Sequence, residues 1–308
     1  MYNSKILIFG SGVIGSVYGG LLANSGQDVT MLARGKRYEF LKENGLQIQT
    51  GKQPVETYAI NVISEVQPQD TYDFVFVTIR AEQVDDALPV LAKVVSPNIV
   101  FMVNNAKGYD AWESVVGKGR IIPAFPGAGG KIENGIIYYN LTGKAVQPTT
   151  FGEKNGKNPA RIEILNQILK NAGFPTAISP DMDAWQKTHL ALVCPLAYGI
   201  YCDGGNNYSL AKNKKAINQT CKALRESFNF IHRSKIGITP SKYHIMRFAP
   251  QFIFARIIAN MFNSEWAESV ISNHALNAKS EMEYLTKDFV ELAKSKGFEL
   301  KELKKMMK

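Results

Sequence analysis

The feature that most constrains the fold is a short apolar run followed at once by a glycine-rich turn. Lys5–Phe9 reads Lys-Ile-Leu-Ile-Phe, which is typical of a strand buried in a parallel sheet. The turn is Gly10-Ser11-Gly12-Val13-Ile14-Gly15, and residues 16–25 then carry a helical pattern that ends at Gly26. Because a strand, a tight turn and a helix in this order begin a βαβ unit, we expect an α/β fold from the first residues onward.

Strand patterns alternate with helix-length intervals through the first half of the chain. This alternation predicts a doubly wound, mostly parallel sheet of the Rossmann type. Further strands are expected at residues 28–33, 74–79, 99–103 and 121–125, with shorter strands completing the sheet at 136–140, 145–147 and 149–151. A helix is expected at residues 158–171.

Beyond about residue 179 the strand patterns stop and helical periodicity continues to the end of the chain. We therefore expect two domains, an α/β domain at residues 1–176 and an all-α domain at residues 177–308. A chain of 308 residues is long enough for two buried cores.

The glycine turn indicates dinucleotide binding. Gly10 permits a tight turn, Gly12 lets the backbone approach a pyrophosphate, and Gly15 allows the helix to pack closely on the strand. The free N–H groups at the helix start attract phosphate. A purely structural glycine turn is the alternative, and it is disfavoured because the motif follows a strand and opens a helix.

Arg34 stands at the end of the second expected strand, where NAD-binding chains tend to carry an acid. Gly35-Lys36-Arg37 follows, so three cations occur within four residues. A guanidinium pairs with a 2′-phosphate, which a carboxylate would repel. The sequence therefore favours NADPH over NADH, with a solvated basic loop as the alternative.

Composition excludes several other classes. The net charge of +9 comes from scattered lysines without a nucleic-acid-binding motif, so it fits an anionic small molecule and no nucleic acid. The four histidines form no HExxH pair, and no metal is expected. Three cysteines without zinc or redox spacing indicate free thiols in a reducing, cytoplasmic setting. Without a long apolar run or a signal-peptide pattern, no membrane contact is expected.

Several motifs along the whole chain resemble the ketopantoate reductase family. Besides the glycine turn and Arg34, they are Val77-Thr78-Ile79-Arg80-Ala81-Glu82-Gln83-Val84, Asn105-Ala106-Lys107-Gly108, Ala184-Trp185-Gln186-Lys187, Ser269 and Ser280-Glu281-Met282-Glu283-Tyr284. The resemblance implies a second domain of the 6-phosphogluconate dehydrogenase C-terminal-like type, which binds substrate and can form a homodimer. It also suggests a place in pantothenate and coenzyme A synthesis.

The resemblance further implies a mechanism. In the family, NADPH passes a hydride to the ketone carbon of a 2-oxo acid, and a lysine at the position of Lys187 donates the proton. Glu281 would be the acid near this lysine and the nicotinamide. Asn105 would lie near both nicotinamide and substrate, Ser269 would bind substrate, and Arg80 would place a cation near the cofactor.

The residues around Lys187 agree with this role. A Ser-Pro-Asp sequence at residues 179–181 is typical of a helix start, and residues 188–202 after the lysine contain no Asp, Glu, Lys or Arg. A lysine that leads an apolar helix face can stabilise and protonate a developing alkoxide. The alternative is a surface lysine lying over apolar residues. For Glu281, the alternative is a surface glutamate on a charged helix.

The chain departs from the family pattern at the substrate positions. Arg80 stands where the family has lysine, and Ala106 and Lys107 alter the family's Asn-Gly-x-Gly turn. Ala191 and Pro195 replace two substrate-binding asparagines, and a third could be supplied by Asn206 or Asn207. Each neutral hydrogen bond contributes about 0.5–1.5 kcal/mol to binding. The loss of these asparagines is therefore expected to weaken the binding of ketopantoate.

The leading hypothesis is an NADPH-dependent reductase of ketopantoate or a similar branched 2-oxo acid. One alternative is a related reductase acting on a less polar carbonyl or imine, favoured by Ala191. The other is a regulatory NADPH-binding protein with little turnover, for which Lys187 would be dispensable.

Overall fold

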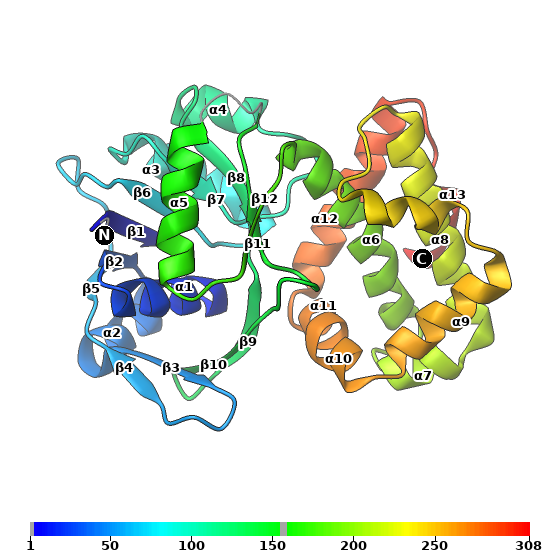
Figure 1. Cartoon of the computed structure of the whole chain (residues 1–308), viewed down its shortest axis with the longest axis horizontal. Coiled ribbons are helices and arrows are strands. Elements are labelled where there is room, and N and C mark those ends of the chain that lie inside the picture. Colours follow the sequence, from blue (N-terminus) through cyan, green and yellow to red (C-terminus); the bar gives the residue numbers. More distant parts are fainter. Residues whose placement is uncertain (1–2, 155–158) are drawn as a thin grey trace. The chain divides into compact units, whose positions relative to one another are not determined.

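The structure is a computed structural model that describes residues 3–154 and 159–308 (Figure 1). The chain divides into two compact units. The first unit comprises Met1–Val103 and Tyr109–Met182, and the second comprises Asn104–Gly108 and Asp183–Lys308.

An eight-stranded sheet forms the centre of the first unit, with the strand order β12-β11-β8-β7-β6-β1-β2-β5. The six strands from β5 to β8 in this order are parallel, β11 runs antiparallel to β8, and β12 is parallel to β11. The strands are β1 (Lys5–Phe9), β2 (Asp28–Leu32), β5 (Asn61–Ile63), β6 (Phe74–Val77), β7 (Ile99–Phe101), β8 (Ile121–Phe125), β11 (Thr149–Phe151) and β12 (Thr176–Ile178). The predicted doubly wound, mostly parallel sheet is confirmed.

Alternate residues of the central strands face opposite sides of this sheet. On β1, Ile6 and Ile8 belong to a core that also includes apolar side chains of α1 (Val13–Asn24) and α5 (Pro159–Asn171). Figure 1 shows these two helices lying over the same side of the strands. Tyr18 of α1 stacks on Phe174 with ring centroids 4.2 Å apart. Phe101 of β7 packs instead on Trp112 of α4 (Asp110–Val116). The remaining helices of the unit are α2 (Gly35–Asn44), η1 (Ala81–Gln83) and α3 (Val84–Lys93).

Three of the expected elements after residue 130 differ in part from the structure. A separate four-stranded sheet has the strand order β4-β3-β10-β9. Its strands are β3 (Leu46–Thr50), β4 (Glu56–Tyr58), β9 (Ala128–Glu133) and β10 (Ile136–Leu141). The strand expected at 136–140 in the main sheet is β10, which pairs with β3 and β9 instead. Residues 145–147 form a turn closed by N–H donors of Val146 and Gln147 to Gly143, and no strand. The expected helix at 158–171 is α5, and residue 158 lies outside the described residues.

The helical part of the second unit begins later than the expected boundary at residue 176. Thr176–Ile178 is strand β12 of the main sheet, so the change of unit falls between Met182 and Asp183. The five residues Asn104–Gly108, which follow β7, also belong to the second unit. The chain therefore passes between the units three times, after Val103, after Gly108 and after Met182.

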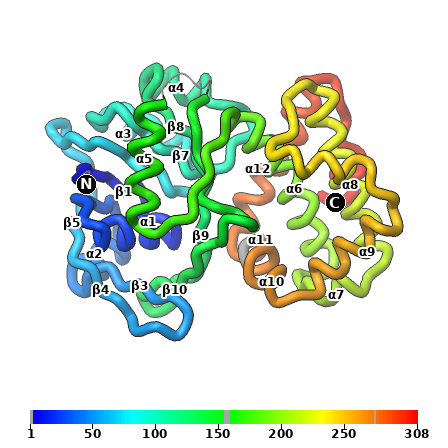
Figure 2. The backbone as a smooth tube through the Cα atoms, in the orientation of Figure 1, coloured from blue at the N-terminus to red at the C-terminus, as the bar shows by residue number. Residues whose placement is uncertain are grey.

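Helices alone form the described part of the second unit, as expected from the sequence. They are α6 (Met182–Cys202), α7 (Asn207–Lys212), α8 (Lys214–Arg233), η2 (Ser241–Arg247), α9 (Gln251–Phe262), α10 (Glu265–Ala267), η3 (Glu268–Ser272), α11 (Asn273–Asn277), α12 (Lys279–Ser295) and α13 (Lys301–Met306). The C-terminal helix α13 packs against α8, and Figure 2 shows the C-terminus beside that helix. None of the helices in the described ranges is long and apolar enough to cross a membrane.

Candidate active site

The glycine turn connects the carboxyl end of β1 to α1 in the first unit. Gly10 adopts a φ of +117°, which favours glycine, and the Thr78 hydroxyl donates to its carbonyl oxygen at 2.9 Å. At Gly15 a Cβ would lie 1.9 Å from the carbonyl oxygen of Gly10, so no larger residue fits between helix and strand. Both glycines are therefore required by packing.

Gly12 differs from these two glycines. A Cβ built on Gly12 meets no atom within 4 Å, so open space lies in front of this residue. Gly12 is the N-cap of α1 and makes no side-chain cap bond, and the first turn of α1 contains no acid. Because the first N–H groups of a helix have no partner within it, this end is suited to a phosphate. The predicted residues from Gly10 to Gly15, with Ser11, Val13 and Ile14 between the glycines, thus form a cradle that fits a pyrophosphate.

The three cations after β2 differ in their exposure to solvent. Arg34, the N-cap of α2, and Lys36 in its first turn are exposed. Arg37 is half-buried and donates to the Ser11 carbonyl at 3.3 Å, the Ser16 hydroxyl at 3.2 Å and the Gly135 carbonyl at 2.7 Å. Burial lowers the pKa of this guanidinium. Arg37 therefore braces the glycine turn, and Arg34 and Lys36 are the cations exposed to solvent.

Arg80 follows β6 and is the N-cap of η1. Its guanidinium lies 4.0 Å from the carboxylate of Glu82, and half of its side chain is exposed. Since parallel strands end at one edge of the sheet, Arg80 and Gly10 lie on the edge formed by the carboxyl ends of the adjacent strands β6 and β1.

Asn105 organises the loop at residues 104–108, which belongs to the second unit. Its side-chain oxygen accepts the N–H groups of Lys107 at 2.8 Å and Gly108 at 3.0 Å. Its amide nitrogen donates to the Gly108 carbonyl at 2.7 Å. The Asn105 backbone N–H is 3.4 Å from the side-chain oxygen of Gln186, on α6. Asn105 thus shapes its own loop, and one N–H of its amide is left for a ligand.

Lys187 lies in the second turn of α6 and is only 8% exposed. Its ammonium forms an ion pair with Asp183, one helical turn earlier. Asp183 in turn lies beside the loop, because a Cβ on Gly108 would be 3.5 Å from its carboxylate. Asp183 is not among the site residues predicted from the sequence, although an acid four residues before a lysine on a helix is the usual signal of such a pair.

The other two predicted residues lie on later helices of the second unit. Glu281 is half-buried in the first turn of α12. Ser269 is exposed on η3, whereas Ser272 is buried, and its hydroxyl lies 3.5 Å from the Gly205 carbonyl. The structure thus describes an ion pair of Lys187 with Asp183 and places Glu281 on a separate helix.

The residues considered in place of the family's asparagines are either apolar or already hydrogen-bonded within the protein. Ala191 is fully buried on α6, and Pro195 lies within the same helix. Asn206 caps α7 by accepting the Ser209 N–H at 2.9 Å. Asn207 is buried and donates to the Phe262 carbonyl at 2.7 Å. Both asparagine side chains therefore have structural partners.

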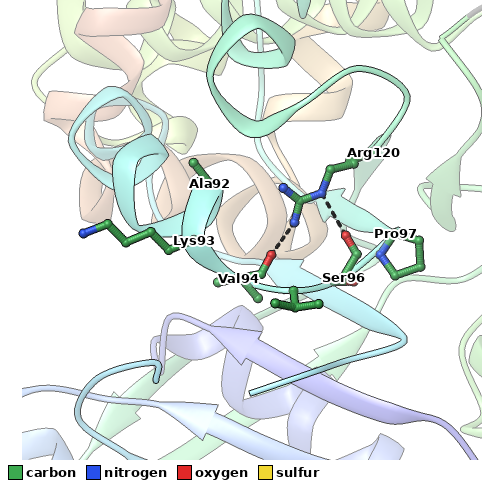
Figure 3. A pocket seen from close by; sticks show the side chains of 7 residues that line it. Ala92, Lys93, Val94, Ser96, Pro97 and Arg120 are labelled. Carbon is green, nitrogen blue, oxygen red and sulfur yellow. Dashed lines mark hydrogen bonds between the residues drawn. The ribbon is translucent and has the colours of Figure 1, made fainter. Parts of the chain in front are cut away.

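A shallow hollow of about 360 Å³ beside Arg120 lies at the opposite edge of the main sheet (Figure 3). It is lined by residues 92–97, which precede β7, and by Arg120, which precedes β8. The Arg120 guanidinium donates to the carbonyls of Val94, Ser96 and Val116. Because it holds the ends of α3 and α4, this arginine is structural. Within the described ranges, no three His, Cys, Asp or Glu residues are grouped to hold a metal.

Known proteins share both sequence and fold with this chain. The family model for ketopantoate reductase PanE/ApbA matches residues 6–156. A 2-dehydropantoate 2-reductase of Pyrococcus horikoshii is 28% identical over 236 residues, which are 73% of this chain and 75% of that protein.

Solved structures extend the likeness over nearly the whole chain. A PanE/ApbA family ketopantoate reductase from Ralstonia eutropha superposes with a TM-score of 0.78 at 16% identity, covering 98% of this chain and 95% of that one. A D-mandelate dehydrogenase in complex with NADH gives a TM-score of 0.76 at 16% identity, covering 98% and 96%. At these identities the structures demonstrate a common fold. Residues 6–156 thus match the ketopantoate reductase family in sequence, and the solved structures show the same fold over nearly the whole chain.

Proposed function

We propose that this protein reduces ketopantoate to pantoate with NADPH, using Lys187 as the proton donor. The observation that carries the proposal is the buried ammonium of Lys187, which is paired with Asp183. A lysine is almost never this deeply buried unless its charge is used or compensated. The match to the ketopantoate reductase family model and the relatives named 2-dehydropantoate 2-reductase support this reaction class.

The glycine turn and Arg34 would hold the cofactor. The open space at Gly12 and the uncapped start of α1 suit the pyrophosphate, and exposed Arg34 suits the 2′-phosphate. When bound, NADPH supplies the hydride that adds to the ketone carbon. The chain leaves the same sheet edge after β7 and continues directly into the Asn105 loop. This continuity supports the assignment of Asn105 to the nicotinamide end of the cofactor.

Lys187 would act on the oxygen of the substrate carbonyl. As the hydride adds to carbon, the electron pair of the C=O π bond moves to oxygen, and the ammonium stabilises that negative charge. The proton passes from Nζ to oxygen and gives the 2-hydroxy acid, and the resulting amine regains a proton from water. Asp183 would hold the ammonium in place, with Glu281 and Ser269 as the further groups for positioning and substrate binding.

The substrate is tested by steady-state NADPH oxidation with a panel of 2-oxo acids. Ketopantoate is expected to give the largest kcat/KM, followed by other branched 2-oxo acids. A higher value with a less polar oxo acid or an imine would instead identify the related reductase that the buried Ala191 favours. Tight NADPH binding without turnover on any compound would contradict the enzymatic proposal and support a regulatory binding protein.

A further inference from the structure

The three groups proposed for the reaction in the second unit stand on three separate segments. Asn105 is on the loop at 104–108, Lys187 is on α6, and Glu281 is on α12. We propose that Lys107 and Asp288 form a latch that fixes the Asn105 loop against the helix of Glu281, and that both are positioning residues. This inference rests on the proposed function.

The contact between loop and α12 is an ion pair with one buried partner. Lys107 Nζ lies 2.9 Å from Asp288 Oδ1, and the Asp288 side chain is only 8% exposed. The ammonium also lies over the ring of Tyr284, 5.6 Å from its centroid. Hydrogen bonding to Asp288 raises the pKa of Lys107, so this ammonium is charged at neutral pH.

The latch reaches the face of α12 that carries Glu281. Positions 281, 284 and 288 are three and four residues apart, and residues at this spacing share one face of a helix. Lys107 contacts the second and third of these residues. Fixing the loop at Asp288 therefore also fixes it relative to Glu281, two turns earlier on the same helix.

Lys107 and Asn105 are mechanically coupled through the loop backbone. The Asn105 side-chain oxygen accepts the Lys107 N–H, so a shift of Lys107 displaces the Asn105 amide. On the other side, the Asn105 backbone contacts Gln186, which is fully buried and directly precedes Lys187. The loop thus connects α6 and α12, and the Lys107–Asp288 pair is its attachment to α12.

Removal of the lysine would leave a buried carboxylate without its cation. Because an uncompensated buried charge is unfavourable, the loop and Asp288 are expected to rearrange toward water.

The test compares Lys107→Ala with Lys279→Ala. Lys279 is also paired with an acid of α12, Glu283 at 3.8 Å, but both side chains are more than half exposed. Lys107→Ala is expected to lower kcat by about 10- to 100-fold, as for displaced positioning groups, with a smaller change in the Kd of NADPH. Lys279→Ala should leave kcat unchanged, and Lys107→Arg should restore much of the activity. Equal kcat values for Lys107→Ala and Lys279→Ala would overturn the proposal.

A second readout does not depend on turnover. Amide hydrogen exchange at Lys107 and Gly108, whose N–H groups bond to Asn105, should be faster in Lys107→Ala and unchanged in Lys279→Ala. If the wild type reduces no 2-oxo acid but this local exchange increases, the latch stands and the proposed function fails. If wild-type turnover is present but exchange in the loop is unchanged by Lys107→Ala, the latch is wrong.

Discussion

Asp183 and Lys187 stand one helical turn apart near the start of α6, and their side chains form an ion pair that holds the lysine ammonium. Lys187 is buried, whereas about a third of the Asp183 side chain is exposed. The carboxylate can therefore compensate the buried charge while it stays in contact with water. In the proposed mechanism, Asp183 therefore shares the role that the family resemblance gives to Glu281 alone.

Replacing Asp183 by asparagine should lower both activity and stability. The isosteric amide removes the negative charge and leaves the Lys187 ammonium without its described partner, which we expect to cost roughly 1–3 kcal/mol of unfolding free energy. Chemical denaturation and kcat measure the two effects. Asp181→Asn, the same change at an exposed position two residues earlier, serves as the control. If both variants behave like wild type, Asp183 has no role in holding Lys187.

Substitutions at Gly15 and Gly12 should have different effects, the first on stability and the second on cofactor binding. At Gly15 an added methyl would overlap the Gly10 carbonyl, so Gly15→Ala should destabilise the fold by about 1–3 kcal/mol or more. At Gly12 the methyl meets only open space, so Gly12→Ala should keep the wild-type Tm but weaken NADPH binding. Thermal denaturation and NADPH titration distinguish the two. Unaltered NADPH affinity in Gly12→Ala would show that the phosphates do not use this space.

Arg34 should determine the preference between NADPH and NADH. A charged hydrogen bond to the 2′-phosphate contributes about 1.5–3 kcal/mol, so Arg34→Ala should weaken NADPH binding by roughly one to two orders of magnitude. NADH lacks this phosphate, so its affinity should change little. Lys36→Ala, at a second exposed cation, is the comparison. Equal losses for NADPH and NADH in Arg34→Ala would contradict the assignment.

The cysteines should differ in their reaction with iodoacetamide. Burial raises the pKa of Cys194 and of Cys221 to about 12, so at pH 8 roughly one thiol in ten thousand is a thiolate in each case. Since the thiolate is the reactive form, both should stay unmodified in the folded protein while exposed Cys202 is labelled. Raising the pH toward 10 should speed labelling of Cys202 first. Peptide mass spectrometry reads the result, and early modification of Cys194 would contradict the packing of α6.

The sequence predicts the main sheet well because its central strands are continuous apolar runs. Strands β1, β6 and β8 are buried in the interior of the sheet, which gives a strong local signal. The second sheet gives no such signal. Strand β9 is Ala-Gly-Gly-Lys-Ile-Glu and mostly exposed, and β10 pairs with β3 almost ninety residues earlier in the chain. Only the tertiary structure reveals that pairing.

The candidate site could be predicted from the sequence where the local backbone geometry permits only one residue type. The glycines of the turn are of this kind, since Gly10 and Gly15 are required by backbone conformation and packing. The placement of the Asn105 loop in the second unit depends on its contact with Gln186, eighty-one residues away, which no local pattern contains. The same holds for Arg37, whose guanidinium faces the glycine turn rather than solvent.

The most direct test of the proposed mechanism is the kcat for ketopantoate reduction by Lys187→Ala, measured beside the Kd of NADPH for the same variant. Loss of the proton donor should lower kcat by about 100-fold or more, and the cofactor affinity should remain that of the wild type because the glycine turn is untouched. A Lys187→Ala variant that reduces ketopantoate at the wild-type rate would contradict the proposal that this lysine protonates the product.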